Sequence, residues 1–221
     1  MIKKLASLLG LTGLAIGQEL LNAKTDAQIE ALNQLQNMPA VGYRKDPDDR
    51  NKNVQQIVEE NGFKFQAYNV TTDDGYINGL HRIVPEKQGA PAILLQHGIE
   101  DCAIEWVINS PDMAPAFLLA RAGYDVWMGN NRGTIYSQGH VNLNASDSAY
   151  WDFDFEEMGL HDVPAFVDFI TAKTGHAKVT YVGHSEGTTQ MFIGASLMPD
   201  YYASKVDLFV ALAPVVRMTT L

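Results

Sequence analysis

Several features are scarce or missing in this 221-residue sequence, and each narrows what the chain can be. Cys102 is the only cysteine, so the chain forms no internal disulfide. No run of lysine or arginine occurs, and 16 basic side chains stand against 26 acidic ones, which gives a formal net charge of −10. That balance argues against nucleic acid as a partner and against charge-driven docking on anionic membranes. Internal repeats and low-complexity tracts are also missing from the sequence.

The composition that remains is that of an ordinary globular domain. Hydrophobic residues make up 46% of the chain and charged residues 19%, which is enough apolar material for a sizeable core. The length falls within the usual range for one domain.

The first 17 residues have the pattern of a secretory signal peptide. Lys3 and Lys4 form a positive start, and residues 5–16 form an apolar stretch that is too short to span a bilayer comfortably. Small residues at Ala15 and Gly17 fit a cleavage site before Gln18. We therefore expect cleavage there, with an uncleaved anchor as the alternative.

The signal-peptide interpretation sets the expected segments of the chain and its expected cellular location. We expect residues 1–17 to be the signal peptide, 18–52 an N-terminal arm or linker, and 53–221 the folded domain. Two N-x-S/T sequons, at Asn69 and Asn144, fit a glycoprotein of the secretory pathway, either secreted or lysosomal.

The periodicity along the chain predicts an α/β fold. A hairpin is expected over residues 63–84, followed by buried strands at 92–96 and 124–129, a β-branched and aromatic strand at 178–183 and an apolar strand at 206–213 that forms an exposed edge of the sheet. Helices are expected at 53–60, 113–122 and from 163 onward. Asp162 is predicted as the N-cap of the last of these helices, and Gly175 as its end. Whether residues 155–160 belong to the same helix is left open by the pattern. Alternating strands and helices favour a mostly parallel sheet with helices on both faces, the α/β-hydrolase arrangement.

One stretch carries the clearest sign of catalytic chemistry: KVTYVGHSEGTTQMFIGA, from Lys178 to Ala195. It reads as a strand, a tight turn of sequence G-x-S-x-G, and the start of a helix. In that context the pattern predicts a nucleophile elbow, a strained turn that lifts a serine hydroxyl out at the top of a sheet. Gly183 and Gly187 lack the Cβ atoms that would clash where strand and helix nearly touch. Ser185 is therefore the candidate nucleophile.

Other residues with possible roles leave more than one interpretation open. Arg132 and Gly133, in the long loop 130–154, either stabilise that loop or simply lie on the surface. Three aromatic residues are expected in the core more than in an acyl pocket: Trp151, Phe153 and Phe155. Cys102 has no visible Cys/His partner arrangement, so a buried thiol is expected.

The histidines give no sign of a metal site. The spacing of His81, His140, His161 and His176 does not match that of metal ligands, so no metal and no cofactor are expected. His184, inside the elbow, is interpreted as a residue of the turn rather than as a catalytic base.

Four separate blocks resemble the acid lipase family, the group of gastric and lysosomal acid lipases within the α/β-hydrolases. The blocks are His97-Gly98-Ile99, NNRGTIYSQGHV at 130–141, WDFDFEEMGLHDVPAFVDFI at 151–170 and GHSEGTT at 183–189. They occur in the family's order, and the similarity covers roughly residues 53–216. The resemblance implies hydrolysis of lipid carboxylic esters, triacylglycerols or steryl esters, at acidic pH. Transient contact with a lipid surface then becomes possible.

The resemblance also implies where the oxyanion of the reaction is bound. In this fold one donor is the N–H after the nucleophile, here Glu186, and the other comes from the loop after the third strand. In the family that second donor is the residue at the position of Ile99. Residue 186 is Gln in familiar members and Glu here, so a carboxylate would repel the oxyanion unless it points away or is protonated.

A serine nucleophile also needs a base and a carboxylate to orient that base, in the chain order Ser, Asp or Glu, His. No histidine follows Ser185, and the acids after its helix are Asp200 and Asp207. We therefore expect a C-terminally truncated lipase whose cap and final strands are missing. The alternative is a catalytically inactive, lipase-like lipid-binding module. The four sequence blocks that resemble acid lipases argue against a peptidase or thioesterase of the same fold.

Overall fold

The structure is a computed structural model in which residues 51–217 are described. The predicted signal peptide at 1–17 and nearly all of the predicted arm at 18–52 lie outside these residues. No described helix is long and apolar enough to cross a membrane.

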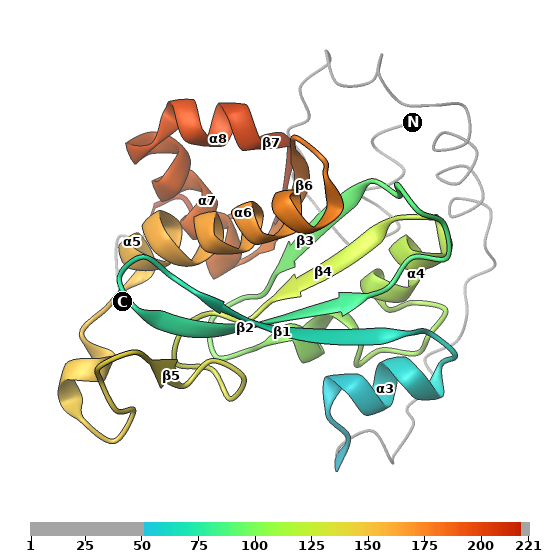
Figure 1. Ribbon diagram of the computed structural model, residues 1–221, viewed down its shortest axis with the longest axis horizontal. Coiled ribbons are helices and arrows are strands. Elements are labelled where there is room, and N and C mark those ends of the chain that lie inside the picture. Colours follow the sequence, from blue (N-terminus) through green and yellow to red (C-terminus); the bar gives the residue numbers. More distant parts are fainter. Residues whose placement is uncertain (1–50, 218–221) are drawn as a thin grey trace.

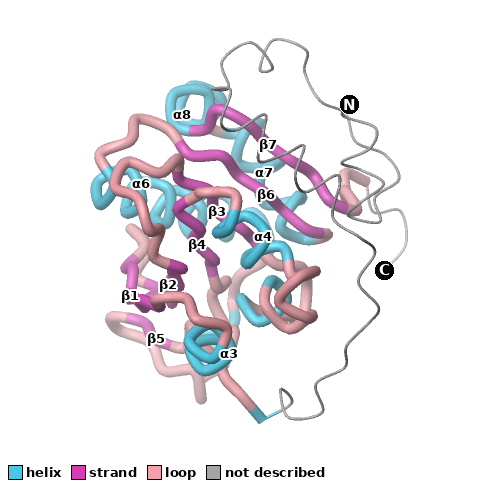
Figure 2. The backbone as a smooth tube through the Cα atoms, turned by 90° about the vertical axis from the view of Figure 1, so that its right-hand side faces the viewer, coloured by secondary structure: helices cyan, strands magenta, loops and turns pink. Residues whose placement is uncertain are grey.

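Seven strands form one mixed sheet. They are β1 (Phe65–Thr71), β2 (Tyr76–Ile83), β3 (Ala92–Gln96), β4 (Asp125–Gly129), β5 (Gly139–His140), β6 (Val179–His184) and β7 (Val206–Leu212). The spatial order is β1-β2-β4-β3-β6-β7, with the short β5 paired to β2 (Figure 2). Strands β4, β3, β6 and β7 run parallel, whereas the hairpin β1–β2 and β5 pair antiparallel. The predicted hairpin and strands are confirmed: β3 and β4 are buried along their whole length, whereas the edge strand β7 is mostly only half-buried. The class is α/β.

Helices cover both faces of the sheet (Figure 1). One face carries α3 (Val54–Glu60), the 3-10 turn η3 (Ala103–Trp106) and α4 (Pro115–Arg121); the other carries α6 (Val163–Thr174), α7 (Glu186–Leu197) and α8 (Pro199–Lys205). Because side chains alternate along a strand, Ile93 and Leu95 pack with the first group while Ala92 and Leu94 pack with the second. Two apolar cores therefore hold the central strands on both sides.

Local signals set the helix ends. Asn53 caps α3 through a capping box, since its side chain accepts from Gln56 N–H while the Gln56 side chain accepts from Asn53 N–H. Gly175 ends α6 in the left-handed conformation at φ +77°, as predicted.

The predicted start of α6 at residue 163 is confirmed, but the N-cap role predicted for Asp162 is wrong. Asp162 has helical angles and makes no cap hydrogen bond, because the chain is already helical before it. α5 (Phe155–Glu157) runs into a π-helical turn, η5 (Met158–Asp162), and then directly into α6. Asp154 provides the actual N-cap, at the start of α5. The side chain of Asp162 is committed elsewhere, to Arg132.

Arg132 is buried, so the surface interpretation is wrong and the stabilising one holds. Its guanidinium pairs with Asp74 in the β1–β2 turn and with Asp162 in the π turn. It also lies over the ring of Tyr76, 3.9 Å from the centroid. The side chain of Arg132 is 1% exposed and that of Asp162 is fully buried. One cation thus joins three segments at the end of the sheet.

The aromatic residues of the block at 151–170 are less buried than expected. Trp151, in the 3-10 turn η4 (Ser148–Trp151), is 48% exposed, so its placement in the core is wrong. Phe153 and Phe155 are half-buried. Trp151 stays outside because its indole N–H donates to Ala145 O within an exposed loop. Cys102 is buried, as expected.

Candidate active site

Ser185 lies at the turn between β6 and α7, with backbone angles φ +49° and ψ −113°. A positive φ is uncommon for a residue with a side chain and costs free energy that the surrounding structure must supply. Ser185 N–H donates to Leu212 O at the end of β7, and Thr188 N–H donates to Ser185 O at the start of α7. The turn is therefore held in its strained form from both sides, and Ser185 stays half exposed.

The two glycines of the elbow are required by close approach. A Cβ on Gly183 would lie 2.6 Å from the carbonyl group of Gly187, and one on Gly187 would lie 2.5 Å from Gln96 O. Both neighbours are backbone atoms, which do not move aside as a flexible side chain can. The predicted reason for glycine at these two positions is confirmed.

The loop after β3 reaches the same point. His97 is buried, and its Nε2 accepts from Asn131 N–H at 3.1 Å, so the proton of the neutral ring sits on Nδ1, 2.7 Å from Gly98 O. Burial lowers the pKa of His97, which keeps the ring neutral. Its role is to fix the path of the loop. Within the described residues, the N–H of Ile99 has no hydrogen-bond partner, and its side chain is 64% exposed.

The side chain of Glu186 points into a polar network and not at the space above Ser185. Its carboxylate accepts from Asn131 Nδ2 at 3.1 Å and from Gln190 Nε2 at 3.2 Å. Burial raises the pKa of Glu186, and these two hydrogen bonds oppose the rise. As the first residue of α7, Glu186 has a backbone N–H among those that a helix leaves without an internal acceptor.

Sequence reasoning missed two residues of this site. Asn131 was part of the block at 130–141, yet nothing in the sequence indicated that it would contact both His97 and Glu186. Glu105 was not singled out at all; its carboxylate accepts from Gly98 N–H at 3.0 Å and also lies close to His184. Both contacts join segments that are distant along the chain, and no local pattern encodes them.

The partners expected of a serine nucleophile are not found here. Among residues 51–217, no histidine or carboxylate hydrogen-bonds the hydroxyl of Ser185. His97 is committed to the loop, and His184 Nδ1 lies 2.6 Å from Glu105 Oε1.

A different trio of residues has donor atoms within 4.8 Å of one another: Asp73, Asp74 and His161. Asp74 already pairs with Arg132, which lowers the pKa of Asp74 against the effect of its burial. Its negative charge is thus largely balanced by protein, and Asp73 is exposed. The sequence spacing gave no hint of this cluster, because β1–β2 and η5 supply it from far apart.

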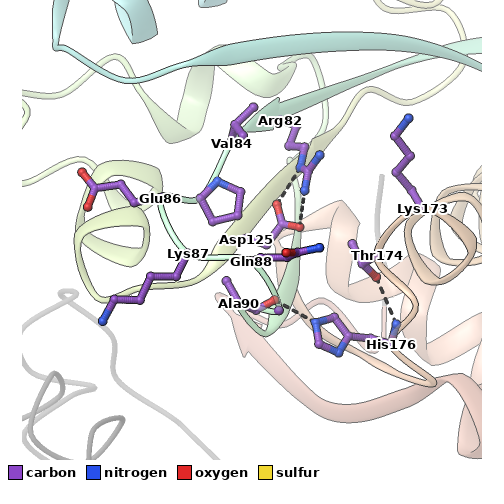
Figure 3. Close-up of a pocket in the computed structure, with 12 residues that line it drawn as sticks. Arg82, Val84, Glu86, Lys87, Gln88, Ala90, Asp125, Lys173, Thr174 and His176 are labelled. Carbon is purple, nitrogen blue, oxygen red and sulfur yellow. Dashed lines mark hydrogen bonds and ion pairs between the residues drawn. The ribbon is translucent and has the colours of Figure 1, made fainter.

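A cavity of about 380 Å³ lies at the opposite edge of the sheet from Ser185 (Figure 3). Its lining includes Ala90 and Asp125, which lie near the amino ends of β3 and β4. Ser185, in contrast, follows the carboxyl end of β6. Two of the polar pairs there are Arg82 with the Asp125 carboxylate, and His176 with Ala90 O. This cavity is separate from the candidate site.

Two family models match the chain. One is described as a partial alpha/beta-hydrolase lipase region and matches residues 54–110; the other is described as an alpha/beta hydrolase fold and matches residues 91–219, more than half of the chain. The chain belongs to the α/β-hydrolase family. The position of Ser185 after a parallel strand and before a helix agrees with that assignment.

Curated relatives narrow the assignment. Lipase member K of Homo sapiens is 45% identical over 175 residues, covering 76% of this chain and 43% of that protein. Gastric triacylglycerol lipase of Rattus norvegicus is 44% identical over 171 residues, covering 75% and 43%. These relatives support the predicted acid-lipase-like group. The chain spans less than half the length of either protein.

Solved structures are similar at a lower level. The structure of epoxide hydrolase VrEH1 from Vigna radiata has a TM-score of 0.49 and 17% identity, over 72% of this chain and 40% of that one. A likeness of this size says nothing about chemistry.

Proposed function

We propose that this chain carries the nucleophile and the oxyanion hole of a carboxylic ester hydrolase that acts on lipid esters. Ser185 attacks the ester carbonyl to give a tetrahedral oxyanion and then an acyl-enzyme. The backbone N–H groups of Ile99 and Glu186 stabilise the oxyanion; losing one such donor costs on the order of 3 kcal/mol of transition-state stabilisation.

The observation that carries this proposal is the conformation of Ser185. A serine held at φ +49° between β6 and α7, half exposed and flanked by glycines that admit no Cβ, has a strain that an ordinary turn does not need. The loop at Gly98 and Ile99 approaches it with one N–H that has no other partner among the described residues.

The substrate class follows from the relatives and from the residues around the site. Triacylglycerol or steryl ester substrates are favoured by relatives named as lipases, one of them a gastric triacylglycerol lipase. Exposed apolar side chains stand on loops at the carboxyl ends of β3, β4 and β7, namely Ile99, Ile135 and Val216. Such side chains suit contact with acyl chains better than with a polar substrate.

The base that should activate Ser185 is not among the described residues, and this shapes the test. Purified chain is treated with a fluorophosphonate probe with and without added imidazole, which replaces a missing histidine base in solution. We expect covalent labelling at Ser185, faster with imidazole, and none in Ser185→Ala. Mass spectrometry of the labelled peptide locates the adduct.

A matched control is Ser196→Ala, an exposed serine on α7 whose hydroxyl donates to Phe192 O. It should label like the wild type. If folded wild type is not labelled under either condition, the hydrolase proposal is wrong. Binding of a long-chain ester analogue without labelling would then identify the chain as a lipid-binding module.

The relatives also bear on where the protein acts. A secretory destination, either outside the cell or in the lysosome, fits the gastric lipase relative and the predicted signal peptide. Both sequon asparagines, Asn69 and Asn144, are exposed, so their side chains are open to glycosylation. A mass shift on treatment with an N-glycosidase after expression in a eukaryotic secretory host tests both points.

A further inference from the structure

Glu105 is an acidic residue beside the site to which the proposed chemistry assigns no role. It lies in η3, seven residues after Gly98, and the η3 residues Ala103 and Trp106 are buried. The Glu105 side chain is 17% exposed, which is low for a carboxylate. Its position therefore needs an explanation from its contacts.

The two oxygens of this carboxylate have two different partners. Oε2 accepts from Gly98 N–H at 3.0 Å, and Oε1 lies 2.6 Å from Nδ1 of His184. The second contact is a close approach of the two side chains and is not counted among the hydrogen bonds of the described residues. Gly98 immediately precedes Ile99, and His184 immediately precedes Ser185. One carboxylate thus contacts the residue before the donor and the residue before the nucleophile.

Support for the loop at Ile99 and Glu100 matters because these two residues are not held by packing of their side chains. The Ile99 side chain is largely exposed and cannot anchor its backbone by packing, and Glu100 has φ +59°, a strained value for a residue with a side chain. On the other side of the loop His97 is fixed by Asn131. A hydrogen bond to a charged acceptor is about twice as strong as a neutral one, so the Gly98–Glu105 contact is a main restraint on Ile99.

An oxyanion hole depends on this kind of restraint. Its donors must stand within about 0.5 Å of the productive geometry, because their stabilisation acts at the transition state and is lost with small displacements. We propose that Glu105 is a positioning residue that sets the distance between Ile99 N–H and Ser185. This rests on the proposed function, in which Ile99 N–H binds the oxyanion.

The charged groups that face Glu105 are His184 from the elbow and Asp101 from the loop. Burial raises the pKa of Glu105, while the Gly98 N–H and His184 oppose the rise and Asp101 adds to it. Protonation weakens a carboxyl group as an acceptor, so the restraint on Gly98 weakens as pH falls. If Glu105 only stabilised the fold, the labelling rate would not follow the protonation of its carboxyl group.

The test compares Glu105→Gln and Glu105→Ala with wild type in fluorophosphonate labelling at fixed imidazole, separating probe binding from the bond-forming rate constant. Glutamine keeps an acceptor for Gly98 N–H and loses the charge, so we expect a rate about 3- to 10-fold below that of wild type where Glu105 is ionised. The ratio of the two rates should approach one as pH falls and Glu105 is protonated, whereas the pH dependence that comes from imidazole itself is common to both proteins. Alanine removes both contacts, and we expect a loss of about 10- to 100-fold with unchanged probe binding.

The matched control is Glu100→Gln, which removes the same charge from an exposed side chain in the same loop. It should label like wild type; an equal loss there, or wild-type labelling by folded Glu105→Ala, overturns the proposal. A second readout needs no activity: amide hydrogen exchange at Gly98 should speed up by about 10-fold or more in Glu105→Ala and by less in Glu105→Gln, which keeps an acceptor; unchanged exchange in Glu105→Ala also overturns the proposal. If wild type itself is not labelled, the proposed function fails and this inference fails with it.

Discussion

Gly98 and Ser185 are packed so closely that a Cβ on Gly98 would lie 3.2 Å from the Cβ of the serine. The same Cβ would lie 3.3 Å from His184 Nδ1. Both distances are tighter than ordinary van der Waals contact, so one side would have to shift by a few tenths of an ångström. The loop after β3 therefore fits against the elbow because residue 98 has no side chain.

This contact gives a direct test of how the loop and the elbow depend on each other. We expect Gly98→Ala to displace Ile99 and to lower the rate of fluorophosphonate labelling by about 10-fold or more while the melting temperature changes by a few degrees at most. Gly187→Ala, whose Cβ would lie 2.5 Å from backbone Gln96 O, should instead fail to fold stably. Labelling of Gly98→Ala at the wild-type rate would contradict the proposed place of the loop in the site.

The acid at position 186 is expected to be dispensable. In Glu186→Gln the amide oxygen still accepts from Asn131 Nδ2, while a negative charge near the developing oxyanion is removed. Because burial raises the pKa of Glu186, the charge develops only as pH rises, so the advantage of glutamine should grow with pH. Labelling rates of both proteins across the pH range measure this. A large loss in Glu186→Gln would mean that the carboxylate has a role of its own.

Removal of the buried cation should be costly. Arg132→Met leaves Asp162 buried without its partner, and breaking a buried pair in this way typically costs about 3–5 kcal/mol of unfolding free energy. The double variant Arg132→Met, Asp162→Asn removes both charges and should recover part of the loss. Urea unfolding of the three proteins provides the comparison. Equal stability of Arg132→Met and wild type would argue against an energetic role for the ion pairs of Arg132 with Asp74 and Asp162.

Acid should destabilise the protein through His81. This side chain is buried between the rings of Phe65 and Tyr136, and burial lowers its pKa to about 4. The unfolded chain takes up the proton near pH 6.5 and the folded chain only near 4, so stability falls as pH decreases between these values. At about pH 5 the cost is about 2 kcal/mol, and almost none remains at about pH 8.

His81→Leu removes this titration. We expect its stability relative to wild type to improve by about 2 kcal/mol on going from about pH 8 to about pH 5, whatever the offset caused by repacking. Urea unfolding at the two pH values gives the difference. A difference that does not change with pH would mean that His81 is not the titrating group.

The sequence predicted this fold well where the signal was local. The apolar run at 92–96, the Asp-Gly turn at 73–75 and the Gly175 stop each correspond to a short-range physical preference, and the structure has them in place. The N-cap role of Asp162 was wrong because its residue type and position match the usual N-cap pattern, whereas its carboxylate is used in a buried pair with Arg132.

The site was predictable to the same extent. Ser185 and its glycines follow from the conformational demands of one turn, and the structure places them accordingly. Glu105 and Asn131 were not predictable, since their partners lie in segments brought together only by the parallel strands β3, β4 and β6. Long-range polar contacts of this kind have no periodic or spacing signal to detect.

The position of Arg132 has a consequence for how long the folded chain lasts. Its partners Asp74 and Asp162 lie 58 and 30 residues away along the chain. Both ion pairs therefore form only after the hairpin, β4 and the π turn have been brought together. Contacts between such distant segments stabilise the chain only after the intervening loops have closed, when most of the entropy cost of closure has already been incurred. Interactions that are missing from the folding transition state slow unfolding and leave the folding rate almost unchanged. We therefore expect replacement of Arg132 to speed unfolding more than it slows folding.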